Sequence, residues 1–478
     1  MNSKMLVLFL GLIALIGCTK TMKADFVVSN VNIIDVETGK VNNAMDILIV
    51  NHKIDSILPH DNNRKYDATK LIDYSGKYIL PGLWDMHVHL SMIGEESIPL
   101  FVLNGVTGVR DMGGNWPELK AWRSKGNSSE ETRFPKIKTA GPILESPRFY
   151  GLYKQILGPD YVEDRIAIDT ENQAYAVVDS LHKVGVDFIK VRTVKSQEIF
   201  KAISEACAKY DLPFTGHIDQ NIGIEFAVEQ NIKSIEHDVF FQALKANEKE
   251  VTDILVAIKQ SKTFFSPTLL ATNQYRLRPK SELIDLLNDT LNQKPTYRKY
   301  LSPTLIEQWN IQFAIQALEQ PVQWDSLITP LRSFAEKIAE NSAVISGTDC
   351  GVTGIIPGAG LHDELRLLVE ELGLNPLDAV KSSTINAVEI LGLQDEYGLI
   401  KPGYYADLLI LNENPLKDIT QTSNIYSVLR NGAVIDQNDI EQGFEQIADK
   451  VEQSRKTYEN NTLNYLNTVL KQMSTSSR

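Results

Sequence analysis

The chain has 478 residues, of which 43% are hydrophobic and 23% are charged, a composition typical of a folded globular protein with up to about three domains. Its 48 Lys and Arg against 61 Asp and Glu give a formal net charge of −13, which would repel a phosphate backbone and argues against a nucleic-acid partner. Three cysteines cannot form a disulfide framework for a chain this long, so a large packed core must stabilise the fold.

The first 18 residues are typical of an export signal. Lys4 precedes the apolar run MLVLFLGLIALIG, which is too short to span a bilayer core of about 30 Å. Residues 15–18, Leu-Ile-Gly-Cys, resemble the bacterial lipobox, which implies cleavage before Cys18 and lipidation of that cysteine. Thr19, rather than Asp, follows it, a pattern of outer-membrane sorting. We therefore expect residues 1–18 to be a lipoprotein signal peptide, and the mature chain to be exported to the cell envelope and anchored in the outer membrane, facing the periplasm.

Segments rich in β-forming residues lie near both ends of the chain. Residues 24–79 contain short apolar runs separated by polar turns, and residues 397–440 contain similar runs with an Asn431-Gly432 turn signal. We expect these two segments to combine into one small β-sandwich domain formed by both termini.

Between these segments, residues 80–396 alternate short β-branched runs with stretches of helical length, the pattern of repeated βα units around a parallel sheet. Eight such units predict an α/β fold, a (β/α)8 TIM barrel with insertions. The predicted strands end near His89, Asp111, Gly141, Arg192, His217, His237, Pro267 and Asp349. The polar residues 271–337 predict a helical insertion after the seventh strand, and the spacing of apolar residues in 441–478 predicts a C-terminal helical extension.

Four histidines end predicted barrel strands. His87 and His89 form a His-x-His motif, and because side chains alternate along a strand, both imidazoles face the same side. His217 and His237 end two further strands, at the carboxyl ends where the catalytic groups of such barrels collect. Neutral imidazoles suit zinc and similar divalent ions, so all four are candidate metal ligands. For the His-x-His pair alone, hydrogen bonding to carboxylates or backbone is an open alternative.

Two other polar residues end predicted strands. Asp349 closes AVISGTDCG, where its carboxylate is able to ligate a metal and accept a proton from water, or alternatively to cap the next helix. Lys190 ends the apolar strand of VGVDFIKVR, and a buried ammonium is unfavourable unless it is paired or neutralised. It therefore either pairs with an acid such as Asp187 or has been converted chemically into an anion.

The order of these residues resembles the metal-ligand set of the amidohydrolase superfamily. Longer stretches are similar as well, among them PGLWDMHVHL, NGVTGVRDMGG, SIEHD, SGTDCG and GLIKPGYYADLLILNENPL. The resemblance extends over most of the mature chain and points to the imidazolonepropionase and prolidase-like branch. It implies a barrel beside a β-sandwich, and a metal-bridging hydroxide that attacks an amide or related bond.

The same resemblance implies a role for each candidate ligand. One metal would be bound by His87, His89 and Asp349, the other by His217 and His237, with carboxylated Lys190 as the bridge. Two divalent ions, expected to be zinc, would lower the pKa of a bridging water and polarise the scissile carbonyl. Asp349 would act as general base and then return the proton to the leaving nitrogen.

Candidate substrate contacts lie near the same end of the predicted barrel. Arg192 lies two residues beyond Lys190, so strand alternation aims it at the same mouth, where it would bind a substrate carboxylate or form a salt bridge at the rim. Arg148, Tyr150 and Tyr153 lie in ESPRFYGLY, interpreted as a loop after strand three, and offer a cation and aromatic rings to a peptide.

The sequence thus predicts an exported hydrolase that cleaves the amide C–N bond of a dipeptide or N-acyl amino acid. Lys190 favours this dipeptidase-like activity over a cyclic amide hydrolase, because the cyclic-amide members of the family lack the lysine and use one metal. A binding lipoprotein without catalysis is a second alternative, although it has no need of Asp349 as a base. The expected partners are a small-molecule substrate and, through Cys18, a membrane; a homo-oligomer stays open.

Overall fold

The computed structural model describes residues 21–237, 248–272, 280–293, 296–316 and 344–476. The predicted signal peptide and the predicted lipidation site, Cys18, lie outside the described residues. Among the residues that are described, no helix is both long enough and apolar enough to cross a membrane.

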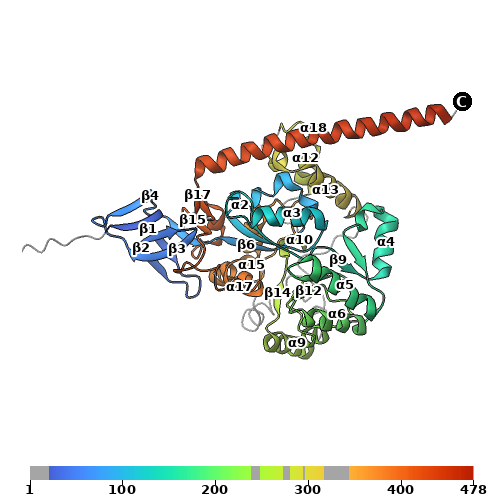
Figure 1. Cartoon of the computed structure of the whole chain (residues 1–478), viewed down its shortest axis with the longest axis horizontal. Coiled ribbons are helices and arrows are strands. Elements are labelled where there is room, and N and C mark those ends of the chain that lie inside the picture. The colour runs from blue at the N-terminus through green and yellow to red at the C-terminus, as the bar shows by residue number, and fades with distance from the viewer. Residues whose placement is uncertain (1–20, 238–247, 273–279, 294–295, 317–343, 477–478) are drawn as a thin grey trace, which may run out of the picture.

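Strands from both ends of the chain form one sheet, in the order β17-β16-β15-β5-β1-β2-β3 with β4 beside β1 (Figure 1). Its strands are β1 (Met22–Ile34), β2 (Val41–Val50), β3 (Lys53–Pro59), β4 (Tyr66–Asp73), β5 (Tyr78–Pro81), β15 (Leu408–Leu411), β16 (Ile425–Arg430) and β17 (Ala433–Ile435). The two ends of the chain meet where β5 and β15 pair antiparallel, with Ile79 opposite Ile410. Val28 and Ile47 are buried in one apolar cluster and Val27 and Leu48 in another, as expected when successive side chains point to opposite faces.

The barrel follows this sheet in the chain. Its strands are β6 (Leu83–Val88), β7 (Val106–Asp111), β8 (Lys136–Thr139), β9 (Ile143–Glu145), β11 (Ile189–Val191), β12 (Phe214–Gly216), β13 (Ser234–Glu236) and β14 (Phe264–Ser266), and β10 (Arg165–Ala167) adds to β9. All pairings among them are parallel. Isolated bridges from Phe265 to Val344 and from Val88 to Cys350 connect β14 back to β6 and close the barrel.

Two predicted strands differ from the expectation. The third is split into β8 and β9, because Gly141 has a positive φ of 65° and Pro142 has no N–H for the ladder. The eighth, expected to end at Asp349, consists in its described part of single bridges rather than a regular strand. Asp349 itself has φ 58°, outside the extended region that a strand requires.

Helices surround the barrel (Figure 1). They are α1 (Leu90–Ile93), α2 (Leu100–Leu103), α3 (Trp116–Gly126), α4 (Pro147–Leu157), α5 (Glu171–Val184), α6 (Gln197–Lys209), α7 (Ile224–Glu229), α9 (Glu248–Ser261), α15 (Ala359–Glu370), α16 (Pro376–Ser382) and α17 (Ile385–Ile390). Local sequence explains α5, which starts with a capping box from Thr170 and Gln173 and ends at Gly185 in the left-handed conformation. In α6, Ile199, Ile203 and Ala206 recur at helical spacing and are buried.

The residues described after β14 are helical, as the sequence predicts for this insertion: α10 (Leu269–Thr272), α12 (Lys280–Asn288), the 3-10 turn η3 (Tyr297–Tyr300) and α13 (Pro303–Gln316). Residues from Gln437 to Ser476 form one long helix, α18, which runs past the insertion and extends beyond the body of the protein (Figure 1). Its first turns are anchored by Ile447 and Val451, which are buried in the main core.

Candidate metal centre

Four of the predicted ligands converge where the barrel closes. Oδ1 of Asp349 lies 3.4 Å from Nε2 of His87 and 3.3 Å from Nε2 of His89. Its Oδ2 lies 3.9 Å from Nε2 of His237. One ligand atom from each of His87, His89 and Asp349 lies within 4.8 Å of the others. The imidazoles of three predicted ligands therefore face one carboxylate.

The ring nitrogens that face away from Asp349 are also hydrogen bonded. The pairs are His87 Nδ1 with Glu236 Oε2 at 2.9 Å, His89 Nδ1 with the backbone oxygen of Gly113 at 3.2 Å, and His237 Nδ1 with Thr268 Oγ1. A carboxylate and a carbonyl oxygen accept hydrogen bonds, so His87 and His89 donate from Nδ1. In the neutral tautomer that donates from Nδ1, Nε2 holds the lone pair that a metal requires. Metal-bound histidines use this arrangement, with the second nitrogen held by an acceptor.

His217 and Lys190 lie beside this cluster. The ring of His237 lies 4.7 Å from that of His87 and 4.9 Å from that of His217, centroid to centroid. Lys190 is 1% exposed on β11. Burial lowers the pKa of His217, and the charge of Lys190 is the next cause. The same charge also contributes to the lowered pKa values of His87 and His237.

The alternative partner considered for Lys190 is engaged elsewhere. The carboxylate of Asp187 lies 3.0 Å from Nη1 of Arg123 and 3.0 Å from Nζ of Lys138. It also accepts a hydrogen bond from the backbone N–H of Thr139. Asp187 therefore neutralises cations on α3 and β8.

The donor set fits a divalent metal such as zinc. Two ligand atoms bound about 2.1 Å from a common zinc ion at the tetrahedral angle lie roughly 3.4 Å apart. The separations between Asp349 Oδ1 and the two Nε2 atoms, 3.4 and 3.3 Å, match this value. Burial lowers the pKa of His87 to about 3, so its imidazole is neutral near pH 7, as a metal ligand must be. Burial alone would raise the pKa of Asp349, but the surrounding imidazoles hold it below the usual range, so the carboxylate is ionised.

Three non-glycine residues at the barrel mouth have left-handed backbones. These are His237 with φ 58°, Thr268 with φ 45° and Asp349 with φ 58°. Such conformations cost free energy and persist only where the surrounding structure imposes them, which occurs often at functional sites. Here two of the three residues, His237 and Asp349, are predicted ligands, and Thr268 is the hydrogen-bond partner of His237.

The predicted substrate contacts are only partly brought together. Arg192 lies 3.1 Å from Oε2 of the buried Glu145 and donates a 2.6 Å hydrogen bond to the hydroxyl of Tyr153, while its side chain remains 28% exposed. Arg148, Tyr150 and Tyr153 belong to the helix α4, so the predicted loop is wrong; Ser146 and Pro147 at its start provide the helix-starting signal. Arg148 is exposed and lies against the ring of Phe149 rather than against Arg192 or Tyr153.

Three buried charged residues at the site were not predicted from the sequence. Asp85 shares the strand face of His87 and accepts hydrogen bonds from the backbone N–H and hydroxyl of Thr348. Glu236 binds His87 and forms a 2.8 Å ion pair with Arg110. The available signal was a charged residue inside an apolar strand, which is unfavourable to bury without a partner.

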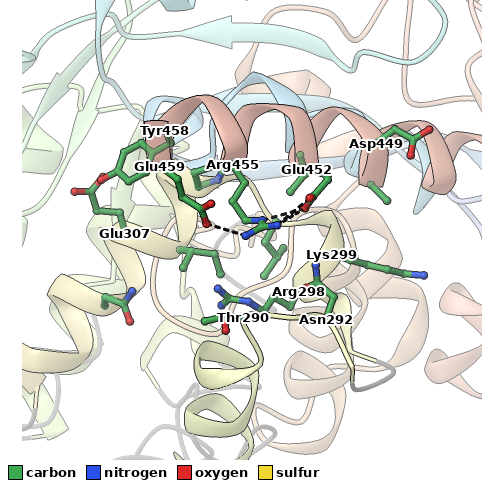
Figure 2. Close-up of a pocket in the computed structure, with 16 residues that line it drawn as sticks. Thr290, Asn292, Arg298, Lys299, Glu307, Asp449, Glu452, Arg455, Tyr458 and Glu459 are labelled. Atoms are coloured by element: carbon green, nitrogen blue, oxygen red, sulfur yellow. Dashed lines mark hydrogen bonds and ion pairs between the residues drawn. The ribbon is translucent and has the colours of Figure 1, made fainter. Parts of the chain in front are cut away.

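A groove of about 530 Å³ lies away from this cluster, between α18 and the insertion (Figure 2). Arg455 projects into it and is held by Glu452 and Glu459 of the same helix at 2.7 to 3.0 Å. None of the described residues that line it is a predicted ligand, so the groove is separate from the metal centre.

Comparison with known proteins identifies relatives in sequence and in structure. Ochratoxinase of Aspergillus niger is 26% identical over 225 residues, which is 47% of this chain and 37% of that protein. This chain therefore matches little more than a third of that relative's length. A Xaa-Pro dipeptidase structure with bound methionine is 21% identical, with a TM-score of 0.66 over 86% of this chain and 99% of that one. A bottromycin amidohydrolase is 20% identical, with a TM-score of 0.67 over 89% and 90%.

These solved structures share the fold of this chain, which confirms the predicted (β/α)8 barrel with a second β domain built from both termini. The family model for "Amidohydrolase family" matches residues 78–435, from β5 to the end of β17 and across the whole barrel. The chain therefore belongs to the amidohydrolase family.

Proposed function

We propose that this protein is a metal-dependent hydrolase that cleaves the amide C–N bond of a dipeptide or an N-acyl amino acid. The observation that supports it most directly is the approach of the Nε2 atoms of His87 and His89 to one carboxylate oxygen of Asp349, at the carboxyl end of the barrel where such enzymes act. A non-catalytic binding protein would have no reason to hold a partly buried, ionised carboxylate among imidazoles at that position.

The proposed ligand set follows the residues that converge there. One divalent ion, which we propose to be zinc, would be held by His87, His89 and Asp349. A second would be held by His217 and His237, and a carboxylated Lys190 would serve both. When bound, such ions polarise a carbonyl group and make water a stronger acid. Carboxylation would turn the buried Lys190 ammonium into an anion, which removes its repulsion toward cations.

Asp349 is the proposed proton carrier. Its carboxylate is ionised and lies among the imidazoles, so it is able to accept a proton from the attacking water. The same carboxyl group then delivers that proton to the leaving nitrogen, which would otherwise depart as an unstable amide anion. The positive φ of Asp349 fixes the direction in which the side chain leaves the backbone.

Arg192 is the proposed contact for the substrate's carboxylate. Its guanidinium is partly exposed and is held in place by Glu145 and Tyr153, and a planar guanidinium binds a carboxylate with two parallel hydrogen bonds. Tyr153, Tyr150 and Arg148 of α4 would line the path to it. Two structural neighbours, a Xaa-Pro dipeptidase and a prolidase complexed with N-methylphosphonate-L-proline, agree with a small substrate that ends in a carboxylate.

A cellular location is proposed with this activity. The sequence pattern around Cys18 supports export, lipidation at that cysteine and anchoring in an outer membrane facing the periplasm. Incorporation of labelled palmitate by the wild type but not by Cys18→Ala would support the lipid anchor, and equal labelling of both would contradict it.

The function is tested by measuring metal content and turnover together. Purified protein should hold about two zinc ions per chain and hydrolyse members of a panel of dipeptides and N-acyl amino acids. Intact-mass measurement under non-denaturing conditions should show the added carbon dioxide of a carboxylated Lys190. One ion per chain, with activity that survives Lys190→Ala, would favour a mononuclear cyclic amide hydrolase instead.

A further inference from the structure

Glu236 is a buried carboxylate at the end of β13 in which both oxygens are engaged. Its Oε2 accepts a 2.9 Å hydrogen bond from Nδ1 of His87. Its Oε1 accepts from Nη2 of Arg110 at 2.8 Å, from Oγ1 of Thr215 at 2.7 Å and from Oγ of Ser234 at 2.5 Å. The residue is 0% exposed. Because Glu236 is fully buried and already bonded to four donors, it is not itself placed to bind a metal or a substrate.

Arg110 determines the charge of this carboxylate. Its guanidinium is 2% exposed, donates from Nε to the backbone oxygen of Met86 at 2.7 Å and from Nη1 to Ser234 at 2.8 Å. Arginine is always protonated in proteins and has no acceptor atom. The buried cation is therefore balanced by an ionised Glu236, and the pair connects β7 to the backbone of β6 one residue before His87.

An ionised carboxylate accepts hydrogen bonds and donates none, which fixes the proton on His87. Nδ1 of that ring must carry the hydrogen, so Nε2 keeps its lone pair, 3.4 Å from Oδ1 of Asp349. The ring plane is fixed as well, because Glu236 cannot move away from its three other donors without leaving them unsatisfied.

We infer that Glu236, held by Arg110, is a positioning residue that sets the tautomer and orientation of His87 for metal binding. The inference rests on the proposed metal-dependent function. It gives a role to Glu236, which is not one of the proposed metal ligands. The competing explanation is that Glu236 and Arg110 form a buried ion pair that serves only the stability of the barrel.

The sheet formed by both ends of the chain offers a matched control for a role in stability alone. Asp407 and Arg430 form a second buried carboxylate and arginine pair, with 3.0 Å between Oδ2 and Nη1 and side chains that are 4% and 1% exposed. Asp407 also accepts from the backbone N–H of Asn431. This pair contacts none of the predicted ligands among the described residues, so Asp407→Asn removes a buried charge without touching the metal centre.

The test uses Glu236→Gln in the full-length protein. The amide has the size of the carboxylate but presents one oxygen and one NH₂ group to four donors, so its NH₂ group must face either Arg110 or His87. Each purified variant is stripped of metal and titrated with Zn²⁺ against a chromophoric chelator. We expect Glu236→Gln to weaken zinc binding about 10- to 100-fold, the usual effect of losing such a partner. Asp407→Asn should lower the unfolding midpoint in urea but leave zinc affinity within about twofold.

The outcomes are distinguishable. Wild-type zinc affinity in Glu236→Gln would overturn the inference while leaving the proposed function intact, whereas a wild type that binds no zinc would defeat the proposed function itself. Equal loss of affinity in Glu236→Gln and Asp407→Asn would mean that global destabilisation is the cause, and would also overturn the inference. If Glu236→Gln does not unfold cooperatively, Arg110→Gln/Glu236→Gln, which leaves no unbalanced buried charge, is titrated in its place and judged by the same thresholds.

Discussion

The backbone N–H of Asp349 donates a 2.7 Å hydrogen bond to the backbone oxygen of His87. This bond belongs to the closure of the barrel, next to the bridge between Val88 and Cys350. It also brings the first and the last predicted ligands of the chain together, 262 residues apart in sequence. Closing the barrel and assembling the candidate metal centre are therefore the same structural event, which explains why a left-handed residue is tolerated at Asp349.

The first prediction distinguishes the role of the Asp349 carboxylate from the role of its left-handed backbone. Asparagine is well tolerated at positive φ, so Asp349→Asn should keep the barrel closed and the unfolding midpoint in urea near that of the wild type. It cannot accept the proton from water, so kcat on any amide that the wild type hydrolyses should fall at least about 100-fold.

Asp349→Ala is the companion variant for the backbone. It should lose the same activity and also destabilise the fold by roughly 1–2 kcal/mol, because alanine is strained at φ 58°. Turnover by Asp349→Asn within threefold of the wild type would refute the general-base role.

The second prediction concerns removal of the metal. A ligand present at 100 times its Kd stabilises the native state by about 2.7 kcal/mol, so chelation should abolish turnover and lower the unfolding midpoint, and Zn²⁺ should restore both. His89→Ala, which removes one of the converging Nε2 atoms, should show a smaller stabilisation by Zn²⁺. His182→Gln changes an exposed histidine of α5 that stacks on Tyr210 and should respond to Zn²⁺ as the wild type does. An identical response from all three proteins would mean that zinc binds elsewhere.

Period-two alternation explains why much of the metal centre could be predicted. In Asp85-Met86-His87-Val88-His89 the polar residues share one face of β6, and parallel strands bring their carboxyl ends to the same edge. Strand ends at His217, His237 and Lys190 follow the same logic, and the structure brings the rings of His217 and His237 to 4.9 Å, centroid to centroid.

Other features were not predicted from the sequence, for different reasons. The ion pair between Arg110 and Glu236 joins residues 126 positions apart, and nothing in either strand's own pattern identifies the partner. The segment ESPRFYGLY is interpreted as a loop from the sequence, whereas the start signal from Ser146 and Pro147 begins the helix α4 there. The irregular eighth strand depends on the left-handed backbone at Asp349, which the closure of the barrel imposes.

The third prediction tests recognition of the substrate carboxylate. Arg192→Lys keeps a positive charge beside Glu145 but loses the planar fork that binds a carboxylate through two hydrogen bonds. We expect KM for an N-acyl amino acid to rise about tenfold or more, with kcat changed much less. When the carboxylate of the substrate is converted to an amide, the KM of Arg192→Lys for that amide should lie within about twofold of the KM of the wild type for the same amide.

Tyr153→Phe removes the hydroxyl that accepts from Arg192 and should give a smaller rise in KM for the free acid. If Arg192→Lys raised KM equally for the free acid and the amide, Arg192 would be only a structural partner of Glu145.

The last prediction is a pH dependence that arises at Glu364. This carboxyl group is fully buried on α15 and accepts hydrogen bonds from the backbone N–H groups of Leu269 and Leu270 at 3.0 and 2.7 Å. Burial raises its pKa from 4.5 to about 8, and the two backbone donors oppose the shift. Between these two values the native state keeps a proton that the unfolded chain has released. The contribution of Glu364 to stability is therefore full below pH 4.5, falls as the pH rises to about 8, and is constant above that.

Glu364→Gln removes this titration while keeping an oxygen acceptor for the two amides. The unfolding free energy of the variant relative to the wild type should therefore increase from pH 5 to pH 8, by at most about 1.4 kcal/mol per pH unit, and level off by pH 9. Urea unfolding of chelator-treated proteins at each pH measures the difference without a contribution from metal binding. A difference that stays constant across this range, or that decreases as the pH rises, would show that Glu364 is ionised in the native state and that its two amide donors outweigh the cost of burial.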